Sequence, residues 1–300
     1  MKKTMIGRVS GQDNGMKLET FLKRRLRLTK NEISRAKFRE NGICVNKEQR
    51  NVSALLSAGD LVEVLLETGN ETSKNLKASK KEISVLYEDT DIIVADKPSG
   101  ICVHPSDSRD GDTLANRLAF YLRNKGEDSV IRIFGRLDRD TSGVVLAAKN
   151  RAAATRLERQ RKNGQLFKTY LTITEGIPLP VNGTIRAPLG PDPKNRKQMC
   201  VTPAGKPAVT HYETLAMQNG LALVRLRLET GRTHQIRVHM ASAGCPLLGD
   251  PLYGNGETPK IRRTALHAQT ICFLQPFTGE MRQAAAPVPQ DMNAIGFFLP

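Results

Sequence analysis

Four charged side chains fall within five consecutive positions of one short segment, Gly135–Gly143, whose sequence is GRLDRDTSG. Residues 131–134 before it and 144–148 after it are apolar apart from Arg132, a pattern typical of two strands joined by a tight polar turn. Most charged turns are only solvated, and composition alone favours that interpretation here. The chemical alternative is that a carboxylate beside a guanidinium acts as a nucleophile or as a base.

The order of residues in this segment favours the chemical alternative. Arg-Leu-Asp-x-x-Thr-Ser-Gly resembles the catalytic motif of the RluA/RluD family of pseudouridine synthases, which isomerise uridine in RNA. The resemblance implies that Asp138, and not Asp140, is the essential catalytic carboxylate. The sequence has Gly135 where the family usually has His, and this departure concerns local RNA contacts more than chemistry.

Further segments resemble the other motifs of that family. They are Lys97–Pro105, the Lys-x-Tyr that ends at Tyr170, the string Gly231–His239 with its continuation at 244–254, and Leu266-His267-Ala268. Together they extend the resemblance over about residues 82–280. Long strings of this kind are specific, whereas periodicity by itself indicates only alternating strands and helices.

The resemblance also implies roles for residues around Asp138. Arg237 would pair with Asp138 and hold it charged and oriented. Tyr170 would lie against the target base and could serve a proton transfer, while Ile236 would contact the other face of the base. Arg136 would enter the RNA where the uridine has been extruded. Whether Asp138 attacks the ribose or removes a proton stays open.

The net charge of the chain narrows the class of partner. Its 300 residues carry a formal charge of +16, and a surplus this large suggests nucleic acid or an anionic membrane surface. A protein of the membrane surface would need an amphipathic anchor, which the sequence lacks. Met1-Lys2-Lys3 is not followed by the apolar stretch of a signal peptide, so we expect a cytoplasmic protein. The positive charge leads us to expect RNA as its partner, and we expect the protein to be a monomer.

No cofactor and no metal are expected from the sequence. The five cysteines include no Cys-x-x-Cys pair, and the sequence has neither of the common glycine-rich nucleotide loops. His234 and His239 are five residues apart, which is not a zinc-binding spacing, and His104 in its loop is interpreted as structural. Isomerisation of uridine needs no oxidant and no external energy, which agrees with these absences.

The N-terminal part of the chain predicts a separate small unit. Between residues 17 and 50 there are 11 Lys or Arg and 4 Asp or Glu, a surplus of 7 positive charges. A solvated helix face usually mixes both signs, so we favour binding to phosphates. Residues 16–66 resemble the S-four RNA-binding domain, named after a small-subunit ribosomal protein. The expected RNA contacts are Arg24, Arg25, Arg35 and Lys37.

The predicted organisation has four parts. An irregular lead (1–15) precedes an α/β S-four-like domain (16–68), a polar linker (69–81) and an α+β catalytic domain (82–300). For the catalytic domain the resemblance implies the pseudouridine synthase fold, a bent, mixed, mainly antiparallel sheet with flanking helices and a central cleft. The sequence itself predicts helices at 113–123 and 151–162, a third helix capped by Thr233, and an exposed basic loop or hairpin within 178–207.

The predicted function is therefore the isomerisation of uridines in structured RNA. Large-subunit ribosomal RNA is favoured as the substrate, because relatives with an S-four domain mostly modify it, and transfer RNA is second. A non-catalytic RNA-binding or ribosome-assembly protein is the alternative from another class. Such a protein has no need of Asp138, Tyr170 and Arg237 together.

Overall fold

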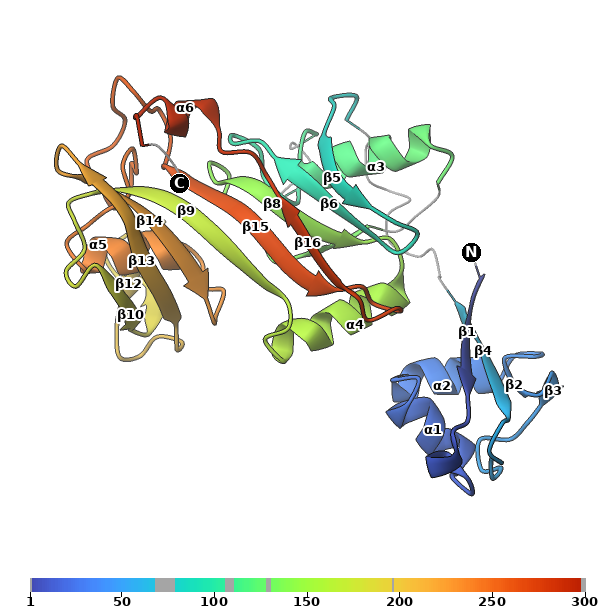
Figure 1. Cartoon of the computed structure of the whole chain (residues 1–300). Coiled ribbons are helices and arrows are strands. Elements are labelled where there is room, and N and C mark those ends of the chain that lie inside the picture. The colour runs from blue at the N-terminus through green and yellow to red at the C-terminus, as the bar shows by residue number, and fades with distance from the viewer. Residues whose placement is uncertain (1, 68–78, 106–110, 128–130, 196, 298–300) are drawn as a thin grey trace. The chain divides into compact units, whose positions relative to one another are not determined.

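A computed structural model of the chain describes residues 2–67, 79–105, 111–127, 131–195 and 197–297. They form two compact units, a small N-terminal one and a larger one that contains the remaining strands (Figure 1). Within the described residues, no helix has the length and apolar character needed to cross a membrane.

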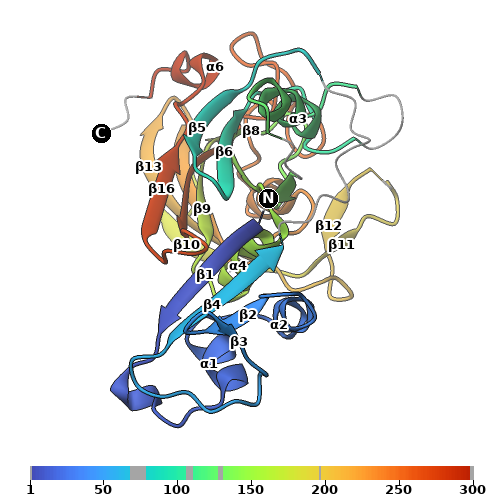
Figure 2. The ribbon, with the colours of Figure 1, turned by 90° about the vertical axis from the view of Figure 1, so that its right-hand side faces the viewer.

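The small unit is a four-stranded sheet with two helices packed on one side of it (Figure 2). The strand order is β1-β4-β2-β3, and the elements are β1 (Lys2–Arg8), η1 (Gly11–Asp13), α1 (Leu18–Arg24), α2 (Lys30–Lys37), β2 (Ile43–Val45), β3 (Glu48–Gln49) and β4 (Leu61–Glu67). α1 buries its apolar stripe of Leu18, Phe21 and Leu22. α2 begins at Thr29, whose side chain forms a capping box with Glu32.

The prediction of an irregular lead over residues 1–15 is wrong for β1. Lys2–Arg8 pairs antiparallel with Leu61–Glu67, so the strand is fixed by an apolar partner more than fifty residues away and not by its own composition. Of the predicted linker, residues 69–78 lie outside the described residues. Ser79 and Lys81 donate hydrogen bonds of 2.9 and 2.8 Å to Asp112, which ties the end of that segment to the large unit.

The large unit is built on a ten-stranded sheet, whose long strands β9 and β15 curve across it (Figure 1). The order is β10-β13-β14-β9-β15-β8-β6-β5, with β16 added beside β15 and β7 beside β8. All pairs are antiparallel except β8 with β15, so the mixed, mainly antiparallel sheet predicted for 82–300 is confirmed. The bounds of its strands are β5 (Ser84–Glu88), β6 (Ile92–Lys97), β7 (Arg132–Phe134), β8 (Ser142–Ala148), β9 (Phe167–Glu175), β10 (Asn182–Arg186), β13 (Val209–Gln218), β14 (Leu221–Leu228), β15 (Leu266–Leu274) and β16 (Met281–Ala285).

Among the described residues of this unit, four helices and a separate hairpin complete the fold. The hairpin pairs β11 (Leu189–Pro191) with β12 (Met199–Val201), within the basic segment where a loop or hairpin was predicted (Figure 2). The helices are α3 (Leu114–Asn124), α4 (Arg151–Lys162), α5 (Gln235–Ser242) and α6 (Gln290–Asn293). The predicted helices at 113–123 and 151–162 are confirmed, and Thr113 caps the first of them as expected.

The parallel contact between β8 and β15 depends on a glycine, Gly143, and is accompanied by a buried histidine, His267. Gly143 has φ +109°, and a Cβ there would lie 2.1 Å from the carbonyl oxygen of Ala268, so no other residue fits without moving the strands. Beside it, Ser142 Oγ lies 2.9 Å from Nδ1 of the fully buried His267, whose Nε2 faces the carbonyl of Ala286 at 3.4 Å. Burial lowers the pKa of His267 to about 4, so it is neutral at physiological pH.

Folding stability is therefore expected to fall in mild acid because of His267. The unfolded chain takes up a proton there below its ordinary pKa of 6.5, whereas the folded chain does so only below about 4. The contribution of His267 to the free energy of unfolding is complete above pH 6.5. Up to about 3 kcal/mol of it is lost as the pH falls towards 4. Urea unfolding across this range measures it. His267→Gln removes the titrating group, so an equally steep pH dependence in that variant would contradict the prediction.

Candidate active site

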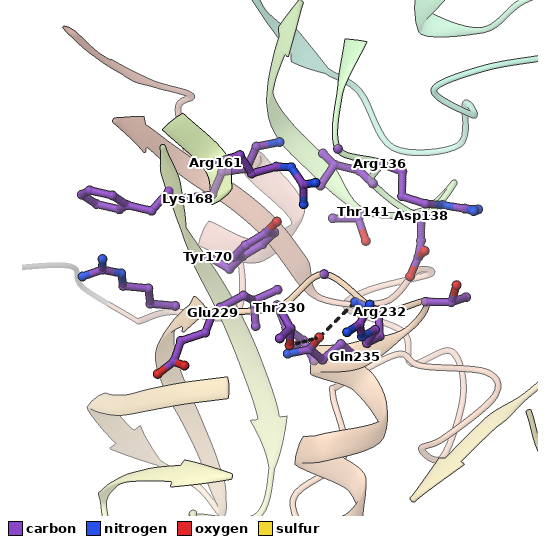
Figure 3. Close-up of a pocket in the computed structure, with 18 of the residues that line it drawn as sticks. Arg136, Asp138, Thr141, Arg161, Lys168, Tyr170, Glu229, Thr230, Arg232 and Gln235 are labelled. Atoms are coloured by element: carbon purple, nitrogen blue, oxygen red, sulfur yellow. Dashed lines mark hydrogen bonds between the residues drawn. The ribbon is translucent and has the colours of Figure 1, made fainter. Parts of the chain in front are cut away.

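A pocket of about 900 Å³ opens in the large unit, over the ends of β9 and β14 and the start of α5. Its walls include Arg136, Asp138, Tyr170, Ile236 and Arg237, the five residues predicted for the active site. Figure 3 shows Tyr170 and Asp138 on opposite sides of this space. Folding thus brings together residues up to 101 positions apart in one concave surface, the usual setting of a binding site.

Asp138 lies in the loop between β7 and β8, and the segment that follows β6 holds this loop in place. The ammonium of Lys97, which has no exposed surface, donates to the carbonyl oxygens of Pro98, Ile101 and Arg139 at 2.8, 2.8 and 3.0 Å. Burial lowers the pKa of Lys97 to about 8, so the ammonium is still charged at neutral pH. The Lys-Pro-x-Gly motif therefore positions the loop that carries Asp138.

The loop also explains the departure at residue 135. Gly135 has φ +71°, a left-handed conformation that glycine adopts without strain. An L side chain would be strained at this position, although no other atom lies within 4 Å of the Cβ it would add. The glycine thus fits the local backbone, at a point on the pocket wall.

Arg237 contacts Asp138, but its principal partner is Asp250. Nε and Nη2 of Arg237 each donate a 2.6 Å hydrogen bond to Asp250, which is completely buried, whereas Nη1 lies 3.6 Å from Oδ2 of Asp138. Burial by itself would lower the pKa of Arg237, but Asp250 and then Asp138 raise it above its ordinary value. Arg237 is therefore a fixed positive charge beside Asp138, held in orientation by a bidentate pair.

Tyr170 lies on β9 with little of its surface exposed. Burial, and to a smaller extent the charge of Asp138, raises the pKa of its phenol well above the ordinary value, so the hydroxyl stays protonated. Two residues earlier on the same strand, Lys168 donates a 3.0 Å hydrogen bond to the carbonyl of Val144, and burial lowers its pKa to about 8. Tyr170 can thus offer the pocket an aromatic face and a proton donor.

The loop before α5 is held by Gln235. Its Oε1 accepts hydrogen bonds from the hydroxyl of Thr230 and the amide of Arg232, as Figure 3 shows, and its Nε2 donates to residues 209 and 210 of β13. The prediction that Thr233 caps this helix is wrong. His234 occupies the cap position in a left-handed conformation, with φ 56° and no side-chain cap bond, because Gln235 binds the loop from inside the helix.

Sequence reasoning missed two residues of the site, Asp250 and Tyr253. Both lie in the string at 244–254 that carried the resemblance, and the aspartate of its Gly-Asp pair was the available signal. His239, buried and bonded to Thr210 and the carbonyl of Ala187, does not reach the pocket wall. Within the described part of the chain, no cluster of three or more His, Cys, Asp or Glu could hold a metal ion.

The four predicted RNA contacts belong to the small unit, on or next to its two helices. Arg24, Arg35 and Lys37 are exposed on α1 and α2. Arg25 is half-exposed but also forms an ion pair of 2.7 Å with Asp13, a carboxylate that is almost completely buried. Arg25 therefore joins α1 to the preceding turn, and the prediction of RNA contact depends mainly on the other three.

Comparisons with known proteins agree with this geometry. Residues 91–242 match the family model described as RNA pseudouridylate synthase. The chain is 40% identical over 255 residues to YhcT of Bacillus subtilis, described as an uncharacterized RNA pseudouridine synthase, which covers 84% of this chain and 83% of that protein. It is 38% identical over 253 residues to ribosomal large subunit pseudouridine synthase D of Xanthomonas campestris pv. campestris, with 80% of this chain and 76% of that protein covered.

A solved structure shares the architecture of the large unit. Human RNA pseudouridylate synthase domain containing 1 superposes with a TM-score of 0.58 at 28% identity, over 70% of this chain and 85% of that one. With a family model that covers half of the chain and with relatives that match over most of their length, the chain belongs to the RNA pseudouridylate synthase family and is an isomerase that acts on RNA.

Proposed function

We propose that this enzyme converts specific uridines of large-subunit ribosomal RNA to pseudouridine, with Asp138 as its catalytic carboxylate. The observation that carries the proposal is the position of Asp138, on the pocket wall and 3.6 Å from a guanidinium that is itself fixed by a buried partner. The choice of RNA is supported by relatives named ribosomal large subunit pseudouridine synthase D, of which several are 36–38% identical to this chain.

The reaction breaks the bond between N1 of uracil and C1′ of ribose and forms a new bond from C5 to C1′. A charged carboxylate beside C1′ serves either as a nucleophile or as the base that removes the 2′ proton, and both routes use Asp138. The target uridine must first leave its stack. Tyr170 and Ile236 then contact its base, and Arg136, exposed at the rim of the pocket, fills the space left in the RNA.

Mapping of pseudouridines in cellular RNA tests this proposal. Carbodiimide adducts that stop primer extension are compared in cells with the protein, without it, and with Asp138→Ala. A stop in large-subunit RNA that disappears in both altered strains supports the substrate and the carboxylate together. A stop that disappears from transfer RNA instead would identify the other substrate, and stops that all persist would contradict the proposed role.

We further propose that the small unit is an S-four-like RNA-binding domain. Its support is the exposed positions of Arg24, Arg35 and Lys37 on two adjacent helices of a unit rich in positive charge. Such contacts with phosphates provide affinity and salt dependence, but no choice of sequence.

Arg35→Ala combined with Lys37→Ala is expected to weaken RNA binding and its dependence on salt. Each phosphate contact contributes about 0.7 to 0.9 to the slope of log affinity against log salt, so the slope should fall by about 1.5. Filter binding at several salt concentrations measures it. Arg123→Ala, a change of the same type on α3 of the large unit, is the matched control. An unchanged slope in the double variant would contradict the proposal.

A further inference from the structure

A chain of polar contacts leads from the β11–β12 hairpin to Asp138. The amide of Met199 donates a 2.8 Å hydrogen bond to the hydroxyl oxygen of Tyr253, and this hydroxyl lies 2.8 Å from Nδ1 of His234. The other ring nitrogen, Nε2, lies 4.0 Å from Oδ2 of Asp138. His234 and Tyr253 also pack edge to face, with ring centroids 5.6 Å apart. The sequence motifs imply no role for either residue.

The hydrogen-bond network favours one position for the imidazole proton. An amide N–H can only donate, so the oxygen of Tyr253 accepts from Met199 and has its own hydrogen to give to His234. With the phenol hydrogen directed at Nδ1, this nitrogen is the acceptor, and in a neutral ring the imidazole hydrogen then lies on Nε2. This tautomer directs an N–H group at Asp138.

The surroundings of His234 favour the neutral ring. Burial lowers the pKa of His234 below its ordinary value, and the positive charges of Arg237 and Arg136 act in the same direction. The carboxylates of Asp138 and Asp250 oppose this change without reversing it. These four charges have the largest electrostatic effect on the ring, and the phenol of Tyr253 contacts it directly. At neutral pH the imidazole is thus a donor without a charge.

We propose that Tyr253 and His234 are positioning residues, which present an uncharged N–H to Oδ2 of Asp138 and leave Oδ1 free to react. Nη1 of Arg237 faces the same Oδ2 atom, at 3.6 Å. Two donors on one oxygen fix the rotation of the carboxylate and direct the other oxygen towards the pocket. Both separations, 4.0 Å for Nε2 of His234 and 3.6 Å for Nη1 of Arg237, are longer than a hydrogen bond, and catalytic contacts of this kind often shorten when substrate binds.

This inference rests on the proposed role of Asp138. It predicts that two substitutions of His234 differ in how much reaction rate they lose. The amide nitrogen of Gln reaches the place of Nε2, whereas that of Asn reaches the place of Nδ1. His234→Gln should therefore keep the rate within about 3-fold of the wild type, and His234→Asn should lose about 30-fold, the range for a hydrogen bond to a charged group. Release of tritium from C5 of uridine, under single-turnover conditions on a large-subunit ribosomal RNA transcript, measures the rate.

Tyr253→Phe adds a dependence on pH that a purely structural role would not give. Without the phenol hydrogen the neutral ring exchanges between both tautomers, so the rate should fall about 5-fold at neutral pH. The deficit should shrink in mild acid, because a protonated ring carries hydrogen on both nitrogens. In the His234→Gln background, Tyr253→Phe should cause no further loss. Tyr121→Phe is the control for loss of a tyrosine hydroxyl. The hydroxyl of Tyr121, on α3, donates a hydrogen bond to Glu88.

Several results would overturn the inference. They are equal losses in His234→Gln and His234→Asn, a deficit in Tyr253→Phe that does not change with pH, or additive losses in the double variant. Asp138→Asn separates this inference from the proposed function. If Asp138→Asn is inactive while His234→Asn has the wild-type rate, only the positioning role fails. If Asp138→Asn is active, the proposed function fails as well.

Discussion

Asp138→Asn is expected to abolish pseudouridine formation, with a loss of about 10⁴-fold or more in single-turnover rate, because the reaction then lacks its only proposed nucleophile or base. Asn has nearly the same shape as Asp, and the side chain of Asp138 is partly exposed, so the fold should remain. The separate contact between Arg237 and Asp250 should also persist. Tritium release from C5 of uridine measures the rate, and urea unfolding confirms that the variant is folded.

Asp140→Asn is the matched control for this experiment. It lies two residues away in the same loop and is also partly buried, but it does not line the pocket. The rate of Asp140→Asn should stay within about 10-fold of the wild type, because Asp140 lies outside the pocket wall and away from the reacting atoms. If the two variants lost the same activity, the effect would come from the loop as a whole, and Asp138 would not be the catalytic group.

Asp250→Asn is expected to produce the largest loss of stability among single substitutions of the site. It removes the charge that accepts both 2.6 Å hydrogen bonds from Arg237, and leaves a buried guanidinium without its principal partner. Breaking a buried pair in this way costs about 3–5 kcal/mol of unfolding free energy. Urea unfolding measures the change at neutral pH.

A second bidentate pair in the same unit provides the comparison. Arg263 donates to Asp291 at 2.6 and 2.8 Å, but the Asp291 side chain is 36% exposed whereas that of Asp250 is not exposed. Water can solvate the carboxamide that Asp291→Asn introduces. The Arg263 guanidinium is itself only 9% exposed, but it keeps hydrogen bonds to the carbonyl oxygens of residues 140, 264 and 266, so the loss of unfolding free energy should be about 1 kcal/mol. If Asp250→Asn and Asp291→Asn lost the same unfolding free energy, burial of the carboxylate would not set the strength of the Arg237–Asp250 pair.

Loss of Asp250 should also reduce the rate in folded protein. Arg237 would no longer be held by two bonds, so its distance from Asp138 would become variable, and a displaced partner of a catalytic group commonly costs about 10²-fold. Measurement at a temperature where Asp250→Asn is folded separates this effect from unfolding. A folded variant with the wild-type rate would mean that Asp250 serves stability alone.

The sequence alone determined the family, the catalytic candidate and the helices α3 and α4. These follow from residues that are neighbours along the chain, as in the segment around Asp138 or the cap at Thr113, where local backbone geometry restricts the residue types. The same local reasoning failed at β1, because its strand depends on pairing with β4. It also failed at the start of α5, because Gln235 takes over the binding of the loop.

Only the tertiary structure decided which charges face one another. Arg237 was predicted to pair with Asp138, yet its two short bonds go to Asp250, thirteen residues further along the chain. Hydrogen-bond partners across a fold depend on distances of a few tenths of an ångström, which no residue pattern encodes. The direction in which His234 points its proton depends likewise on Tyr253 and on an amide of a distant hairpin. The motif thus specifies the chemistry that is available, and packing around the pocket sets the geometry in which it can operate.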